Sequence, residues 1–404
     1  MNNKNNIPTN EELETLLEYY NKGNTNEAEQ LAISINEKFP ENQFAWKVLG
    51  ALWWKKNKIS EALKALQTAI ELSPKDPSAH YNLGVAFQEI DKLDEAEKAY
   101  RKVIKFKKDY PEVYNNLGVV LQAKGMIEEA KESFKLETIY NPGYSGAFWN
   151  LSSCVKTIKD SEYWIDKCLA VDPNHINAKL TKAALSYYSG NQENFYNLME
   201  SAFKSHSFMR SFSWVFNLPY LPELHFNTWY FFDSVIKKSI TTRPFYEYGV
   251  WRASSFKYLI KKFKKGYGFD TFTGLPENWN VGEGIEKTGT YSNDGNIPKI
   301  KGGEFIIGEF KDTLPIFFSR NRPIASMINF DADLYSSTIC ALNYSKEIID
   351  ENTILVFDQF LINESWEEDE FKALNEFCSN NKLDYKVLAV SFFTKQVAVK
   401  LVGI

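Results

Sequence analysis

Histidine is scarce in this sequence of 404 residues, which holds only four, and the last of them is His225. Residues 243–404 therefore contain no histidine, the commonest general base of enzymes. A proton that leaves a bound group in that part of the chain must go to a carboxylate or a lysine, or be lost with the help of a metal ion. An imidazole base could come only from outside this part of the chain, as from His225 in the segment before it.

The sequence also lacks long apolar runs, an excess of basic residues and paired cysteines. No stretch approaches the roughly 18 apolar residues of a membrane span, and the start lacks the apolar segment of a signal peptide. Lys and Arg number 47 against 52 Asp and Glu, which argues against a nucleic-acid partner. The four cysteines have no spacing typical of zinc sites or disulfide frameworks. We therefore expect a reduced cytoplasmic protein with no membrane or nucleic-acid partner.

A 34-residue repeat organises the first half of the chain. Leucine-glycine pairs begin at Leu49, Leu83 and Leu117, and an alanine follows each leucine 13 positions later. Prolines recur in the same phase, where each second helix would end. This pattern resembles the tetratricopeptide repeat (TPR), whose period is also 34 residues. We expect an all-α TPR solenoid over residues 9–205, with a concave face that binds a partner.

Three asparagines, Asn82, Asn116 and Asn150, occupy the same position in successive repeats. Such a ladder resembles the asparagines of O-linked N-acetylglucosamine transferase, where side-chain amides pair with an extended peptide backbone. The resemblance predicts that a protein or peptide binds along these amides. Asparagine is also common at this repeat position, so a structural role is the alternative. Glycosyl transfer is disfavoured because the second half of the sequence lacks that transferase's domain.

The second half of the chain contains two segments of different composition. Residues 206–242 are rich in aromatic residues, which predicts a helical connector. In residues 243–404, apolar runs of strand length alternate with helical segments, and a hairpin follows. This order predicts a doubly wound, Rossmann-like α/β sheet of seven strands. The polar stretch 278–303 is long enough to predict a lid or a disordered loop.

Two of these apolar runs end in carboxylates. Asp331 and Asp333 follow the first run, and Asp358 follows the second. Ligands of parallel α/β sheets bind beyond the carboxyl ends of the strands, so three acids are predicted to face one crevice. An aspartate before a helix can instead cap the helix, which is the role we expect for Asp333.

Six motifs of the second half carry a further resemblance. They are EYGVWRASS (247–255), GFDTFTGLPENW (268–279), FKDTLP (310–315), FDADLYSST (330–338), VFDQF (356–360) and QVAVKL (396–401). Together they resemble the macrocin O-methyltransferase family, which belongs to the class I methyltransferases that use S-adenosylmethionine (SAM). The resemblance covers residues 243–404 and implies methyl transfer to a hydroxyl of a small molecule or sugar.

The resemblance also implies a SAM site at the ends of the first three strands. Gly249 would let the backbone approach the cofactor, with Glu247 beside it, and Asp270 would accept the ribose hydroxyls. Phe272 would flank the adenine or belong to the core. Glu309 is a candidate for the adenine edge.

A magnesium site is implied at the ends of the fourth and fifth strands. Asp331 and Asp358 would hold the ion and serve as the catalytic pair, because a bound cation lowers the pKa of an acceptor hydroxyl. Gln359 stands where the family often has a second aspartate, and its amide oxygen also suits a hard cation.

Two departures from the family pattern keep an alternative open. Ala253 stands where a second glycine is usual, and Gln359 replaces an acid. Alanine is acceptable at position 253 if φ is negative. The leading hypothesis is a SAM-dependent O-methyltransferase with a TPR scaffold. The alternative is a non-catalytic TPR adaptor with a degenerate methyltransferase fold.

Overall fold

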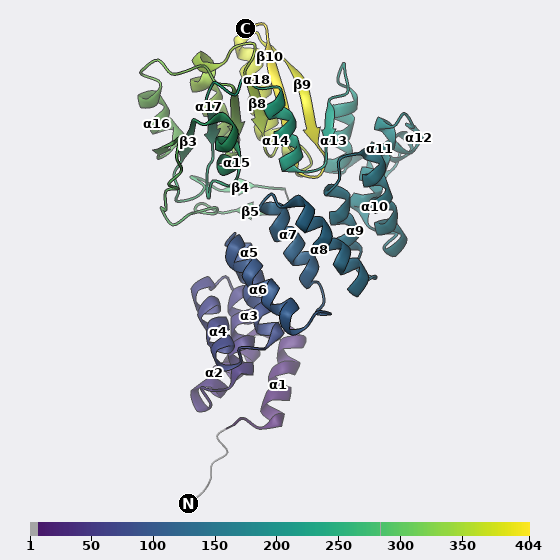
Figure 1. Cartoon of the computed structure of the whole chain (residues 1–404), viewed down its shortest axis with the longest axis vertical. Helices are drawn as coiled ribbons and strands as arrows, with labels where there is room; N and C mark the ends of the chain where they lie inside the picture. The colour runs from purple at the N-terminus through teal and green to yellow at the C-terminus, as the bar shows by residue number, and fades with distance from the viewer. Residues whose placement is uncertain (1–6, 283) are drawn as a thin grey trace, which may run out of the picture. The chain divides into compact units, whose positions relative to one another are not determined.

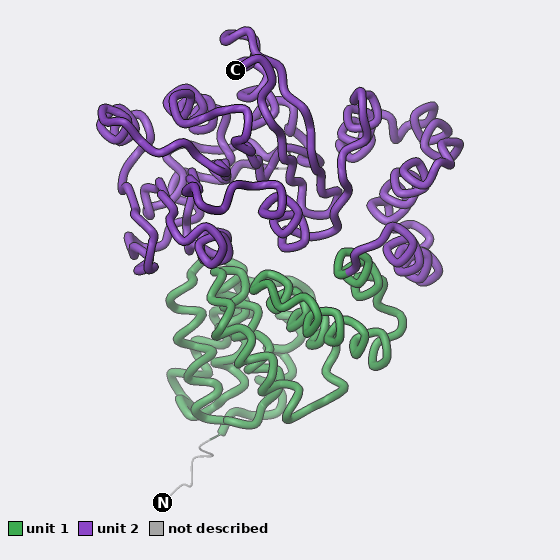
Figure 2. Tube along the Cα trace, turned by 45° about the horizontal axis from the view of Figure 1, so that its top comes forward, with its two compact units in different colours: residues 1–154 green, residues 155–404 purple. Residues whose placement is uncertain are grey.

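The computed structural model describes residues 7–282 and 284–404, and it divides into two compact units (Figures 1 and 2). Unit 1 is Met1–Cys154 and unit 2 is Val155–Ile404. The sequence instead predicted boundaries after residues 205 and 242. No helix in the described part of the chain combines the length and the apolarity needed to cross a membrane.

Unit 1 is an all-α solenoid of paired helices. They are α1 (Asn10–Asn21), α2 (Thr25–Lys38), α3 (Gln43–Lys55), α4 (Ile59–Leu72), α5 (Pro77–Glu89), α6 (Leu93–Phe106), α7 (Val113–Ala123), α8 (Ile127–Tyr140) and α9 (Ser145–Ser153). The repeated glycine explains the pairing, because a Cβ on Gly84 would lie 2.6 Å from the Tyr100 ring and one on Gly118 would lie 2.5 Å from the Phe134 ring. Each glycine thus makes room for the large side chain of the next helix.

Unit 2 combines helices with a mixed sheet. Its helices are α10 (Ile158–Val171), α11 (Ile176–Tyr188), α12 (Glu193–Met199), α13 (Ser207–Phe216), α14 (Thr228–Lys237), α15 (Ser254–Phe263), α16 (Phe310–Phe317), α17 (Tyr335–Ser345) and α18 (Glu370–Asn381). Short 3₁₀ turns cover Ala202–Ser205, Lys346–Ile348 and Trp366–Glu368.

The main sheet has eight strands, in the order β1-β9-β10-β8-β7-β2-β3-β6. They are β1 (Glu223–His225), β2 (Phe245–Tyr248), β3 (Gly266–Asp270), β6 (Gly303–Ile307), β7 (Met327–Phe330), β8 (Ile354–Phe357), β9 (Asp384–Ser391) and β10 (Val397–Val402). The strands from β8 to β6 are parallel, whereas β10 is antiparallel to both of its neighbours.

The predicted number of seven strands was wrong by one. The extra strand is β1, which pairs in parallel with β9 through the register Glu223↔Ala389. It lies in residues 206–242, so that segment is not purely helical. The predicted loop 278–303 also contains two short paired strands, β4 (Trp279–Asn280) and β5 (Ile285–Glu286). Strand β1 pairs with a distant segment, which local composition does not show, whereas β4 and β5 form a short local hairpin.

Aromatic side chains cover both faces of the sheet. Phe245 packs on Phe256 of α15 with ring centroids 4.7 Å apart, whereas its neighbour Tyr246 stacks on Tyr267 at 4.8 Å on the other face. Phe317 of α16 meets Tyr267 edge-on at 5.4 Å on that second face. Successive side chains of a strand point to opposite faces, so helices protect the strands on both sides.

The last repeat-like helices pack within unit 2, which explains where the units divide. Tyr187 of α11 stacks on Phe216 of α13 with centroids 3.8 Å apart, and Phe212 lies 4.5 Å from Phe392 beside β9. The Ser211 hydroxyl also accepts a hydrogen bond from the Ile362 backbone N–H at 2.8 Å. Helices α11 and α13 therefore share the core of the sheet.

Candidate functional site

The carboxyl ends of four neighbouring strands, β3, β2, β7 and β8, are joined by backbone contacts. The N–H of Gly249 donates to Phe269, that of Asp331 to Tyr248 at 2.8 Å, and that of Asp358 to Phe330 at 3.0 Å. Gly249 has φ +86°, and a Cβ there would lie 1.8 Å from the carbonyl oxygen of Asp331. Only glycine fits this close approach, so the predicted special position of Gly249 has a clear steric basis.

Glu247 is a buried acid beneath this edge. Its side chain is fully buried and accepts a hydrogen bond from the Ser255 hydroxyl, and its second oxygen has no hydrogen-bond partner among the described residues. Burial raises the pKa of Glu247 to about 8, with smaller contributions from the charges of Asp358 and Asp270. Asn329 sits opposite Glu247 in the sheet register, and its side chain opposes part of this rise in pKa, although neither of its amide atoms makes a hydrogen bond of ordinary geometry to a described residue.

Asp270 lies where the sequence predicted it, at the end of β3, but backbone donors already bind its carboxylate. One oxygen accepts the N–H groups of Val250 and Trp251 at 2.6 and 2.7 Å, and the other accepts that of Phe272 at 2.6 Å. Phe272 is fully buried and contacts the ring of Phe305 at 6.2 Å. In this conformation Phe272 is part of the core.

Two further residues of the predicted cofactor region differ in environment. Ala253 has φ +63° and precedes α15, so the condition of a negative φ is not met. An alanine in the left-handed region costs roughly 1–2 kcal/mol relative to glycine. Glu309 begins α16 and pairs with Lys311, with its oxygen 2.7 Å from the ammonium.

The predicted acids gather at the ends of β7 and β8. Burial and the charge of Asp358 raise the pKa of Asp331 well above its usual range. Burial also raises the pKa of Asp333 to about 8, with a contribution from Asp358. Asp333 has φ +60°, and no hydrogen bond from its side chain caps α17, so the predicted capping role is wrong. Three acids therefore repel one another at this edge, as expected from their places at neighbouring strand ends.

Sequence reasoning missed two charged residues of this cluster. Lys395, in the turn before β10, donates to the amide oxygen of Gln359 at 3.2 Å. Glu370 is fully buried, accepts the Gln359 N–H at 2.9 Å and leaves one oxygen without a described partner. Burial, together with Asp358 and Asp333, raises the pKa of Glu370 well above its usual range. Both residues sit in polar stretches of sequence that give no sign of burial.

The side chains fit a divalent cation only in part. Asp331 and Asp358 form the repelling pair of carboxylates that a cation would stabilise. The amide oxygen of Gln359, however, accepts from Lys395 and Asn363, and its nitrogen lies 3.5 Å from an Asp358 oxygen. Gln359 is therefore not oriented as a ligand. Within residues 7–282 and 284–404, no group of three or more His, Cys, Asp or Glu side chains is arranged to hold a metal ion.

Two of the three ladder asparagines make side-chain hydrogen bonds to other residues of unit 1. Asn116 donates to the Tyr81 hydroxyl at 2.9 Å, and Asn150 donates to the side-chain oxygen of Asn115 at 2.9 Å. Asn82 is half-buried on α5 and makes no side-chain hydrogen bond to another described residue. The three amides thus differ, and Asn82 keeps its full bonding capacity.

Comparison with known families bears on unit 1. The family model described as TPR repeat matches residues 54–91 and 89–125. The N-terminal region contains TPR repeats. The matched segments are the central TPR repeats predicted from the 34-residue spacing, and they extend from the end of α3 through α7. No curated protein matches the chain.

Several solved structures are similar to the chain at low identity. Pseudomonas aeruginosa pilF is 16% identical, covers 50% of this chain and 95% of its own, and has a TM-score of 0.45. PilW, a type IV pilus biogenesis factor, is 16% identical, with coverages of 52% and 98% and a TM-score of 0.44. YrrB, a TPR protein with a peptide-binding site, is 17% identical, with coverages of 46% and 94% and a TM-score of 0.38. These scores are too low to support an argument about function.

Proposed function

We propose that unit 2 is a cytoplasmic SAM-dependent O-methyltransferase domain and that the TPR repeats of unit 1 bind a protein or peptide. The acceptor would be a hydroxyl of a small molecule or sugar, as the motifs of residues 243–404 imply.

The order of the parallel strands carries this proposal. Counted from β2 in chain order, β6-β3-β2-β7-β8 read 3-2-1-4-5. Doubly wound nucleotide-binding sheets have this order, and they bind ligands where the order reverses, beyond the carboxyl ends of the strands. Here the reversal falls between β2 and β7, where Gly249 meets Asp331. The steric need for glycine and the buried acids thus coincide with the expected ligand position.

Each residue has a defined task in this proposal. SAM would supply an activated methyl group on sulfur, and the protein needs to orient an acceptor oxygen against it. Asp270 would accept the ribose hydroxyls once the N–H groups of Val250 and Trp251 release its carboxylate. Asp331 and Asp358 are placed to take the acceptor proton or to hold a magnesium ion that favours the alkoxide. Gln359 would join them only after its amide turned away from Lys395.

Calorimetry with SAM and the full-length protein tests the proposal. We expect binding that Asp270→Asn weakens by about 2 kcal/mol, because the amide keeps one acceptor but loses the charge that strengthens the ribose hydrogen bonds. Asp312→Asn, an exposed acid in the first turn of α16, is the matched control and should bind like the wild type.

A second candidate function rests on one observation. The carboxylate of Asp270 is fully engaged by backbone N–H groups and Phe272 is buried, which also suits a fold that no longer binds a cofactor. A wild-type protein that takes up no SAM at millimolar concentration would favour this non-catalytic adaptor. Under that result, the TPR repeats would carry the function alone.

A further inference from the structure

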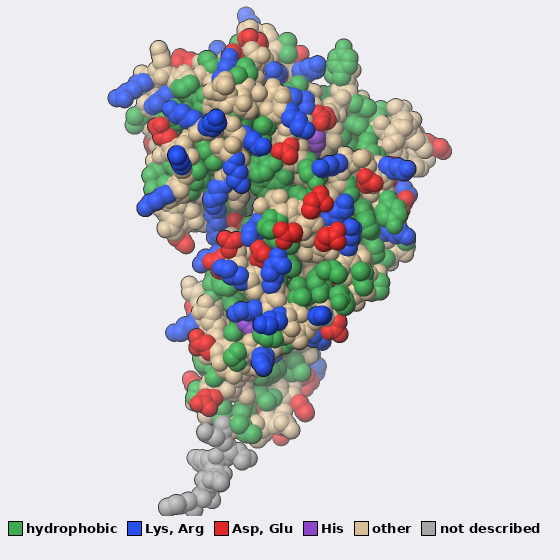
Figure 3. All heavy atoms as spheres, in the orientation of Figure 1, with side chains coloured by type: hydrophobic (Ala, Val, Ile, Leu, Met, Phe, Trp, Pro, Cys, Tyr) green, Lys and Arg blue, Asp and Glu red, His purple; other side chains and the backbone are tan. Residues whose placement is uncertain are grey.

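Lysines gather on one outer surface of unit 2, away from the acidic site. The members are exposed, and none forms an ion pair with a described carboxylate. They are Lys257, Lys261, Lys262, Lys264, Lys265, Lys299 and Lys301, which we call the lysine patch. Figure 3 shows blue side chains gathered over the region that Figure 1 labels α15 and β3.

Two segments build the patch. No Asp or Glu occurs between Tyr248 and Asp270, so α15 and the residues after it carry charge of only one sign. The turn before β6 lies against the end of α15, because the Gly266 N–H donates to the Gly302 carbonyl at 3.0 Å. A Cβ on Gly302 would also touch the Lys264 carbonyl. The tertiary fold therefore adds Lys299 and Lys301 to the lysines of the helix.

Helix stabilisation accounts for only part of this charge. Lys261 and Lys262 lie in the last turn of α15, where cations interact favourably with the helix dipole. Lys257 lies at the start of the helix, and Lys299 and Lys301 belong to another segment, so the dipole does not explain them. Some other lysines of unit 2 have acidic partners, as Lys238 has in Glu223 and Lys372 has in Glu368. In a chain of net charge −5, seven unpaired lysines on one surface point to an anionic partner.

The patch is separate from the acidic site. Apart from Lys257, its lysines lie near Gly266 and Gly303, the first residues of β3 and β6, whereas Asp331 and Asp358 follow the last residues of β7 and β8. The two surfaces are therefore at opposite edges of the parallel sheet. A ligand of the acidic site would not reach the lysines.

The side chains around the patch disfavour lipid and nucleic acid. The large apolar residues Phe256, Leu259 and Phe263 of α15 are buried and Ile260 is half-buried, so the helix presents no exposed apolar face to a membrane interface. The patch contains no arginine. The aromatic ring next to it, Tyr267, is 2% exposed and lies beneath the Lys265 ammonium, so bases cannot stack there.

We propose that the lysine patch binds an extended acidic segment of a partner protein. Lys257 and Lys261 are four residues apart on α15, which places them about 6 Å apart, and Lys265 follows two residues after the helix ends. Acidic side chains at every second residue of an extended peptide recur at about 6.6 Å, which matches that spacing. The same chain carries TPR repeats, an architecture that presents extended binding surfaces, so a protein partner suits both units.

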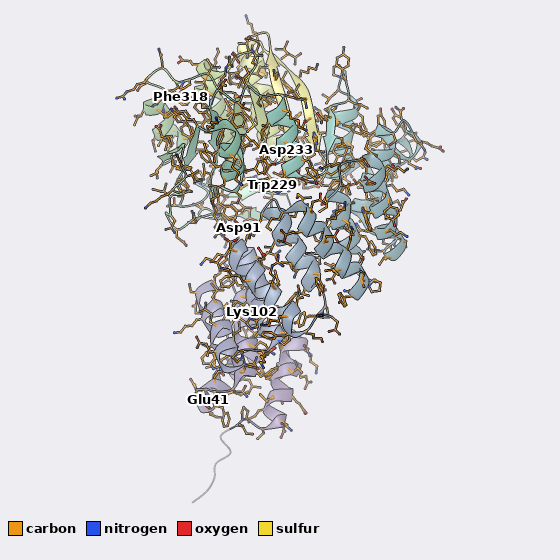
Figure 4. All side chains as sticks on the ribbon, viewed as in Figure 1. Glu41, Asp91, Lys102, Trp229, Asp233 and Phe318 are labelled. Atoms are coloured by element: carbon orange, nitrogen blue, oxygen red, sulfur yellow. The ribbon has the colours of Figure 1, made fainter. Side chains whose placement is uncertain are left out.

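Fluorescence anisotropy with a labelled peptide of eight Glu-Ser repeats tests the proposal on the full-length protein. We expect binding that weakens with salt and falls about tenfold in Lys257→Gln/Lys261→Gln/Lys265→Gln, because each exposed charge pair contributes little alone. The control is Lys98→Gln/Lys102→Gln/Lys105→Gln on α6, which removes three exposed lysines that form no ion pair with a described carboxylate. Figure 4 labels Lys102 among them. The control variant should change affinity less than about twofold.

Other outcomes would overturn the proposal. An equal loss in both triple variants would show that only the net charge matters. Tighter binding to phosphatidylserine vesicles or to a 20-nucleotide thymidine strand than to the acidic peptide would assign the patch to lipid or nucleic acid. Circular dichroism of each variant separates these results from misfolding, since the changed side chains are exposed.

Discussion

The two units treat buried charge differently. In unit 1 the buried carboxylate of Glu137 accepts the backbone N–H groups of Glu112 and Asn115, both at 3.1 Å. In unit 2, Glu247 and Glu370 are fully buried, and each leaves one carboxyl oxygen without a described partner. An unpaired buried oxygen costs roughly 1–3 kcal/mol. The buried carboxylate of unit 1 is therefore stabilised by its hydrogen bonds, whereas the fold of unit 2 bears the free-energy cost of unpaired carboxyl oxygens at one edge of its sheet.

This difference in the treatment of buried carboxylates indicates where a ligand would bind. Strained or unsatisfied groups persist when the surrounding fold stabilises them, and they cluster at functional sites. Gly249, Ala253 and Asp333 have positive φ near the same edge. The buried acids and the unusual backbone thus share one location. In unit 1, Glu112 also has positive φ beside the buried Glu137, but there both carboxylate oxygens accept backbone N–H groups.

The largest expected effect comes from Gly249→Ala. The added Cβ would meet the Asp331 carbonyl at 1.8 Å, so we expect a loss of about 4 kcal/mol in the free energy of unfolding, or failure to fold. Gly23→Ala in unit 1 is the matched control, because Gly23 also has positive φ but has open space around it. It should cost about 1 kcal/mol. Urea unfolding measures both, and equal costs would contradict the close approach at Gly249.

The second prediction concerns pH. Folded Glu247 has a pKa of about 8, above its usual 4.5, so the folded state holds a proton that the unfolded state has released between these values. The contribution of Glu247 to stability is therefore complete below pH 4.5 and is lost as pH rises toward 8. From pH 5.5 to 7.5 the wild type should lose about 2 kcal/mol more than Glu247→Gln.

A carboxylate of unit 1 supplies the control for that measurement. The pKa of Glu29 is lowered to about 2, chiefly by its hydrogen bond with Lys56. Its contribution is present above pH 4.5 and is lost only as pH falls toward 2. Glu29→Gln should therefore leave the pH 5.5–7.5 difference unchanged. A wild type whose stability is flat across this window would disprove the buried, protonated state of Glu247.

The third prediction concerns magnesium. Gln359→Asp adds a carboxylate beside Asp358, so calorimetry should show magnesium binding at least about tenfold tighter than in the wild type. Asn82→Asp is the control. It adds a carboxylate to unit 1, outside the acid cluster of unit 2, and should create no magnesium site. Unchanged affinity in Gln359→Asp would mean that Lys395 continues to neutralise the cluster.

The smallest effects are expected in the asparagine ladder. Asn150→Ala removes the hydrogen bond to Asn115 and should cost about 1 kcal/mol in the free energy of unfolding. Asn82→Ala removes no hydrogen bond within the protein and should change stability by less than about 0.5 kcal/mol. If Asn82 binds a partner, Asn82→Ala should weaken partner binding without lowering the free energy of unfolding. Equal destabilisation would assign the whole ladder to folding.

Sequence predicts unit 1 well because its contacts repeat locally. The glycine of each Leu-Gly pair and the large side chain it receives lie 16 residues apart, as Gly84 and Tyr100 do, so spacing alone reveals the contact. In unit 2 the strand positions were also predictable, since buried parallel strands read as continuous apolar runs. The ends of β7 and β8 then located Asp331 and Asp358.

Other features of unit 2 depend on distant partners and could not be predicted. Glu370 follows a run of exposed-looking acids, and only the packed α18 shows that it is buried. Lys395 lies in a hairpin turn whose approach to Gln359 depends on the sheet order. The sequence of strand β1 resembles that of a connector, because no local pattern indicates its pairing with β9. Each depends on contacts between segments far apart in the chain.

The pairing of β1 with β9 also sets an order of events during synthesis. Helices of unit 1 contact their immediate neighbours along the chain, and contacts of this kind form quickly because little loop entropy is lost. Strand β1 leaves the ribosome long before β9, its partner near the end of the chain. Its backbone groups must therefore stay hydrated or be shielded until translation is almost complete, while unit 1 is already free to fold.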